Sequence, residues 1–123
     1  MITRVTADQI MDMDRMELKN FRASFFLDRR DRYRTMDQRM ALLDFMVLLS
    51  LVQDMRDWSV LSEPGLAGKM LDAGEEWEGE IEDAREIDRR SVEMHEEIAR
   101  EFESKGGRPA LAATLARLNE LCE

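Results

Sequence analysis

The sequence has few residues that interrupt regular structure and almost no cysteine. Its 123 residues include six glycines, two prolines and one cysteine. Turns need glycine and proline most, so their scarcity argues against a fold of many short strands. Cys122 cannot form an internal disulfide, and nothing else in the chain indicates an oxidising compartment. The length suits a single domain over residues 1–123.

Long apolar runs are also missing. The most apolar stretch, residues 40–52, has 13 residues and contains Asp44, and it is too short to span a bilayer. The N-terminal sequence MITRVTADQI has neither an apolar signal core nor a cleavage pattern. We therefore expect a protein that is cytoplasmic or virion-associated, is not secreted by a signal peptide and has no membrane span.

Charge, by contrast, is abundant and unevenly distributed. Charged residues make up 37% of the chain, and the net charge is −9. Residues 1–61 hold ten Lys/Arg and ten Asp/Glu, whereas residues 62–123 hold eight and 17. A chain with this excess of negative charge repels nucleic-acid phosphates, so we expect no general binding of DNA or RNA.

Start and stop signals divide the chain into about four helices. Thr6-Ala-Asp-Gln9 and Thr35-Met-Asp-Gln38 have the pattern of capping boxes. Ser62-Glu-Pro-Gly65 and Lys105-Gly-Gly-Arg-Pro109 are typical of helix breaks. These signals predict an all-α fold, a bundle or an extended helical array, with helices over about residues 7–27, 36–58, 64–104 and 109–122. Residues 28–34 either continue the first helix or form a polar bend.

The third predicted helix is the longest. Its apolar positions from Leu66 to Phe102 are spaced by three or four residues, close to the α-helical period of 3.6. One amphipathic helix of about 40 residues would form a rod of roughly 60 Å. This exceeds the diameter of a compact domain, so part of the rod should project or pack against another molecule.

The second predicted helix is apolar nearly all round between residues 40 and 52. Such a helix must be surrounded, either by the other helices or by other copies of the chain. We predict that four of its residues are largely buried, namely Leu43, Val47, Leu48 and Leu51.

The residues that usually carry enzyme chemistry are not grouped. A di-iron bundle needs Glu-x-x-His on two helices, but the chain has one histidine, His95, with Val92 three residues before it. Gly65-Leu-Ala-Gly68-Lys69 lacks the spacing of a phosphate-binding loop. We therefore predict no enzyme activity, no catalytic residues, no cofactor, no metal site and no small-molecule substrate.

Two charged segments are candidate protein-binding sites. An arginine cluster consists of Arg29, Arg30, Arg32, Arg34 and Arg39. An acidic stretch has a net charge of −8 over residues 72–88, and its candidate residues are Glu75, Glu76, Trp77, Glu78, Glu80, Glu82 and Asp83. Solvated helix faces would explain both segments. Alternatively, the arginine cluster binds phosphate, which guanidinium groups suit, or the two segments dock on each other through opposite charge, within the chain or between copies.

The sequence thus favours a non-enzymatic structural or assembly protein that packs helical faces against copies of itself or other subunits. This role would suit a small component of a viral particle or of a similar complex. The alternative is an acidic inhibitor or regulator that occupies a basic, nucleic-acid-binding site on a protein partner.

Overall fold

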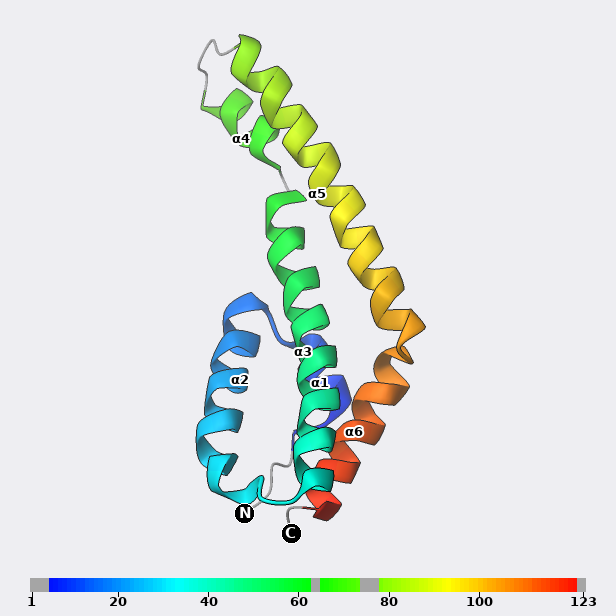
Figure 1. Ribbon diagram of the computed structural model, residues 1–123. Coiled ribbons are helices and arrows are strands. Elements are labelled where there is room, and N and C mark those ends of the chain that lie inside the picture. Colours follow the sequence, from blue (N-terminus) through cyan, green and yellow to red (C-terminus); the bar gives the residue numbers. More distant parts are fainter. Residues whose placement is uncertain (1–4, 63–64, 74–77, 122–123) are drawn as a thin grey trace.

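The computed structural model describes residues 5–62, 65–73 and 78–121, with side chains omitted at 60–62, 78 and 79 (Figure 1). These residues are almost entirely helical and contain no strand, which confirms the all-α prediction. The described helices are α1 (Ala7–Asp12), α2 (Arg15–Arg29), the 3-10 turn η1 (Arg30–Arg32), α3 (Met36–Ser62), α4 (Leu66–Asp72), α5 (Glu78–Ser104) and α6 (Gly107–Leu121).

The molecule is elongated and organised around α3 (Figure 1). Helices α1, α2 and α6 lie around the first part of α3, and α5 runs back alongside it. Helix α4 and the first half of α5 form a hairpin that projects beyond this bundle. We call this hairpin, residues 66–72 and 78–90, the acidic arm.

The prediction of one helix over residues 7–27 is wrong, because the chain breaks between α1 and α2. The Thr6–Gln9 capping box opens α1 as predicted. A second box then opens α2, where the Asp14 carboxylate accepts from the Glu17 amide and Glu17 accepts from the Asp14 amide. Asp14-Arg-Met-Glu17 carries this signal in the sequence.

Polar side chains of α3 hold the α1–α2 break in place. The guanidinium of Arg56 donates to the carbonyls of Met11 and Met13 at the end of α1. The buried amide of Gln53 donates to the carbonyl of Arg15, which in turn pairs with Asp57 at 2.7 Å. The contacts of Arg56 occupy carbonyls that the end of α1 leaves without intrahelical partners.

The turn from α2 to α3 reverses the chain over a few residues. Helix α2 continues to Arg29 and η1 follows, so residues 28–34 divide between helix and turn. The Thr35–Gln38 capping box then opens α3 as predicted. The amide of Gln38 also donates to the carbonyl of Leu121, which joins the start of α3 to the end of α6.

The prediction of a single helix of about 40 residues is also wrong. Two helices, α4 and α5, occupy this part of the chain, and the longest described helices, α3 and α5, have 27 residues each. The Asp88 carboxylate on α5 accepts from the amides of Leu66 and Ala67 at the start of α4, at 2.7 and 3.0 Å. Regular apolar spacing does not distinguish one straight helix from two that fold against each other, and this cap favours the folded arrangement.

Gly65 and Gly106 permit the chain to turn before α4 and after α5. Gly65 has a φ of 83°, and a Cβ there would lie 2.8 Å from Asp88 Oδ2. Gly106 has a φ of 105° and ends α5, as its sequence motif predicts. Both positions need glycine because other residues rarely adopt these dihedral angles. Helix α6 then begins at Gly107, slightly earlier than predicted.

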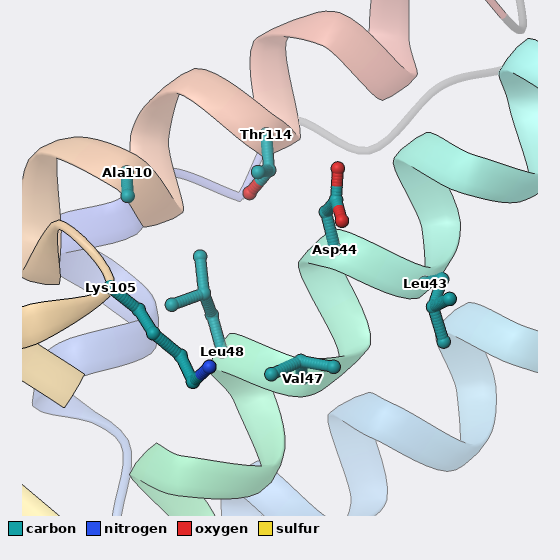
Figure 2. A pocket seen from close by; sticks show the side chains of 7 residues that line it. All are labelled: Leu43, Asp44, Val47, Leu48, Lys105, Ala110 and Thr114. Carbon is teal, nitrogen blue, oxygen red and sulfur yellow. The ribbon is translucent and has the colours of Figure 1, made fainter. Parts of the chain in front are cut away.

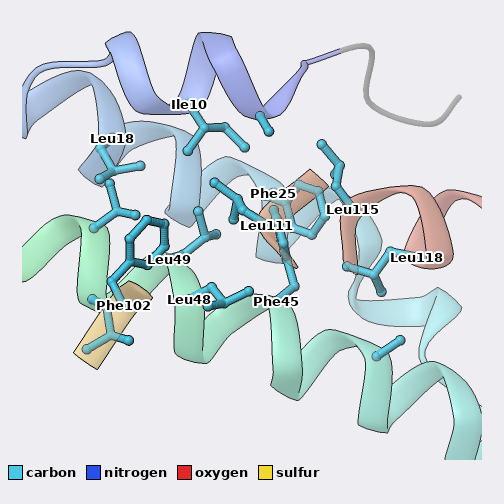
Figure 3. Close-up of a cluster of buried hydrophobic side chains, with 14 of the residues drawn as sticks. Ile10, Leu18, Phe25, Phe45, Leu48, Leu49, Phe102, Leu111, Leu115 and Leu118 are labelled. Atoms are coloured by element: carbon cyan, nitrogen blue, oxygen red, sulfur yellow. The ribbon is translucent and has the colours of Figure 1, made fainter. Parts of the chain in front are cut away.

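The core lies where α1, α2, the end of α5 and α6 meet α3 (Figure 3). Phe25 and Phe45 are buried with ring centroids 5.1 Å apart. The prediction that Leu48 and Leu51 are buried is confirmed. The same prediction for Leu43 and Val47 is wrong, since they are 56% and 39% exposed. The surrounding helices cover the other sides of α3 and leave this face open.

Replacing Leu48 with alanine should destabilise the fold by about 2–5 kcal/mol because it creates a cavity in the core. Leu43→Ala removes the same atoms from the exposed face of the same helix and should change stability by no more than about 0.5 kcal/mol in the monomer. Chemical denaturation at low protein concentration measures both. Equal effects for the two variants would contradict this placement of α3.

Candidate protein-binding surfaces

Helix α3 presents a row of exposed apolar side chains, which we call the outer stripe. Its members and their exposed fractions are Met36 (70%), Met40 (49%), Leu43 (56%) and Val47 (39%). The spacings of four, three and four residues place all four on one helix face. Sequence analysis missed this surface because α3 is apolar nearly all round, so no single face stands out.

A groove lies beside the outer stripe, between α3 and α6 (Figure 2). Leu43, Val47, Leu48 and Ala110 supply its apolar lining, while Asp44, Lys105 and Thr114 add polar groups. Lys105 lies in the turn between α5 and α6, so two helices and this turn form the groove. The outer stripe and the groove together make a continuous apolar surface with charges at its edge.

The acidic arm carries local ion pairs over part of its length. Arg89 pairs with both Glu86 and Glu93, and Arg90 also pairs with Glu86. Hydrogen bonds from Arg89 and Arg90 lower the pKa of Glu86 to about 2. Arg85 lies 3.7 Å from Glu82. These carboxylates are therefore compensated within α5.

Two other acidic residues of the arm have no such partner among the residues that the structure describes. Glu80 and Asp83 are exposed and form no ion pair with any described residue. Of the remaining candidates, Glu75, Glu76 and Trp77 lie outside the described residues, as does the side chain of Glu78. The described part of the arm thus combines paired carboxylates with exposed, uncompensated ones.

The arginine cluster lies at the turn between α2 and α3, at the opposite end of the molecule (Figure 1). Arg29 is buried, with its guanidinium 4.3 Å from the centre of the Phe25 ring. Arg34 donates to the carbonyl of Asp31, and Arg39 donates to that of Tyr33. Arg30 is exposed and Arg32 is half-buried. Arg29 therefore stabilises the bundle, and the other four contribute to the surface.

The structure does not bring the arginine cluster and the acidic arm together within one chain. Among the described residues, no ion pair joins the two regions, and Figure 1 places them at opposite ends. Docking between these segments therefore requires two copies of the chain, and in that form it stays a prediction.

No group of three or more His, Cys, Asp and Glu side chains within the described residues is placed to hold a metal ion. His95, on α5, is half-buried. None of the helices is long and apolar enough, over the part of the chain that the structure describes, to cross a membrane.

Comparison with known proteins gave no match, either to a protein-family model, to a curated protein or to a solved structure. The surfaces described above are therefore the basis for the functional proposals that follow.

If the arginine cluster docks on the acidic arm of another copy, Arg30→Glu combined with Arg32→Glu should weaken self-association. Reversing Glu80 and Asp83 to arginine in the same chain should partly restore it. Added salt should weaken docking as the Debye length falls below about 8 Å. Sedimentation equilibrium at low and high salt measures this effect, and unchanged association at low salt would show that both segments are solvated surfaces.

Proposed function

We propose that this protein is a non-enzymatic assembly protein that packs helical faces against copies of itself or against other subunits. The outer stripe is the observation that carries the proposal. Scattered exposed apolar residues are normal in soluble proteins. Four large apolar side chains in one row, next to an apolar groove, are instead typical of an interaction surface.

The position of the stripe strengthens this proposal. It lies on α3, whose opposite face holds the buried core residues Phe45, Leu49 and Val52. The backbone there is fixed by the bundle, so little order is lost when a partner binds. A rigid helix with an open apolar face is well suited to receive another helix.

Several charged groups in the described residues have structural roles, which is consistent with a non-enzymatic protein. Asp14 and Asp88 cap helices, and Arg56 occupies the carbonyls at the end of α1. Glu86 pairs with neighbouring arginines on the same helix. Catalysis instead requires acid–base groups that converge on a cavity, and the groove beside the stripe offers Asp44 and Lys105 in an otherwise mostly apolar lining.

The acidic arm favours a second function, that of a regulator that binds a basic site on a protein partner. The arm projects from the bundle, and Glu80 and Asp83 are exposed there without ion-pair partners among the described residues. Exposed charges of one sign accelerate association with a surface of the opposite sign. The two functions use different ends of the molecule and are compatible in one protein.

Leu43→Glu should abolish or strongly weaken assembly through the outer stripe, because a carboxylate would be buried against apolar side chains. Leu27→Glu is the matched control, since Leu27 is 64% exposed on α2 and lies outside the stripe. Size-exclusion chromatography with light scattering, over a range of concentrations, measures the mass of each variant.

We expect wild type and Leu27→Glu to form the same oligomer and Leu43→Glu to be a monomer with unchanged helix content. The proposal would be contradicted if the wild-type protein stays a monomer at every concentration and also binds no other subunit at the stripe.

A further inference from the structure

The outer stripe has the spacing of a coiled-coil seam. In a heptad labelled a to g, Met36 and Leu43 occupy d positions, while Met40 and Val47 occupy a positions. The stripe runs over residues 36–47 of α3, slightly less than two heptads, and all four side chains are exposed. A seam of this kind fits a second helix with the same pattern. If the proposed assembly function holds, another copy of α3 supplies such a helix.

Opposite charges flank the two sides of the stripe. Arg39 occupies the g position before Met40, and Asp37 and Asp44 occupy the e positions after Met36 and Leu43. Arg39 and Asp44 are both exposed. The Nε of Arg39 donates to the carbonyl of Tyr33 at 3.1 Å, and its terminal nitrogens form no ion pair with any described residue. Asp44 forms no ion pair with any described residue, although Lys105 lines the same groove.

These flanks distinguish the two orientations in which copies of α3 can pair. In a parallel pair, the g side of one helix faces the e side of the other, so Arg39 meets Asp44 of the other copy, and symmetry repeats the contact. In an antiparallel pair, the e side of one helix faces the e side of the other. Asp37 and Asp44 of one copy then face the same residues of the other copy. Like charges that face each other disfavour the antiparallel pair.

We propose that a second copy of this chain packs in parallel on the outer stripe, with Arg39 of each copy paired to Asp44 of the other. The seam between the stripes provides the apolar contact, and the two ion pairs set the orientation. Because the helices are parallel, both acidic arms project from the same end of the dimer. The dimer therefore presents two arms together to any basic partner.

The test uses Arg39→Glu and Asp44→Arg, first separately and then mixed in equal amounts. Each variant alone has two like-charge contacts across the parallel seam, so its self-association should fall by roughly tenfold or more. In the mixed dimer both contacts join opposite charges again, so association should return towards that of wild type. Sedimentation equilibrium measures the affinities, and native mass spectrometry identifies the mixed dimer by its mass.

Control variants carry the same charge changes away from the stripe. Arg117→Glu on α6 and Asp12→Arg on α1 are at exposed positions and should leave self-association unchanged, both alone and mixed. Circular dichroism confirms that each variant is folded. If Arg39→Glu loses the turn contact to Tyr33 and unfolds, Arg39→Gln replaces it, because its mixture with Asp44→Arg still contains one Arg39–Asp44 pair.

The outcomes separate this proposal from the assembly function. If the mixture of the two variants associates nearly as strongly as wild type, the result supports the parallel pair. If wild type associates, Leu43→Glu abolishes association and the mixture does not recover, the parallel orientation is wrong and the assembly function stands. If wild type does not self-associate, the second copy is excluded as the occupant of the stripe.

Discussion

The need to cover α3 determines the rest of the structure. This helix concentrates apolar residues over most of its circumference, and an isolated helix of that kind would expose a large apolar surface to water. Helices α2, α5 and α6 pack against it, and α1 packs on α6. The buried residues Phe25, Phe102 and Leu111 come from three of these helices and belong to one core with Phe45 of α3. The face that remains open is the one that we assign to assembly.

Polar contacts fix where each covering helix lies, since apolar burial alone is not directional. Arg56 holds the end of α1, Gln38 joins α3 to α6, and Asp88 caps α4 from the neighbouring helix. A hydrogen bond between neutral groups contributes about 0.5–1.5 kcal/mol, and one to a charged group about 1.5–3 kcal/mol. The effect of these contacts is to select one arrangement among several of similar apolar burial. Helix α4 has seven residues and is too short to be stable alone. The Asp88 cap and packing on α5 hold α4 in place and so define the acidic arm.

The sequence predicts where helices begin and end better than it predicts which helices pack against each other. Thr6, Thr35 and Gly106 mark ends that the structure confirms, because capping depends on residues within one turn. The Asp14–Glu17 box is equally local, and its pattern is present in the sequence. The division of α4 from α5 depends on Asp88, more than twenty residues from the amides it caps, so local patterns could not reveal it. The exposure of Leu43 beside buried Leu48 depends on which sides of α3 the other helices cover, and an all-round apolar sequence leaves that undetermined.

Oxidation of methionine side chains at several protein concentrations tests the central claim that the outer stripe is an interface. Met36 and Met40 lie in the stripe, whereas Met16 on α2 and Met94 on α5 are 54% and 39% exposed elsewhere. Dilute peroxide converts accessible methionine to the sulfoxide, and peptide mass spectrometry gives a rate for each residue. The account predicts that oxidation of Met36 and Met40 slows as assembly proceeds, while Met16 and Met94 keep their rates. Equal rates for Met36 and Met40 in the monomeric and assembled protein would contradict it.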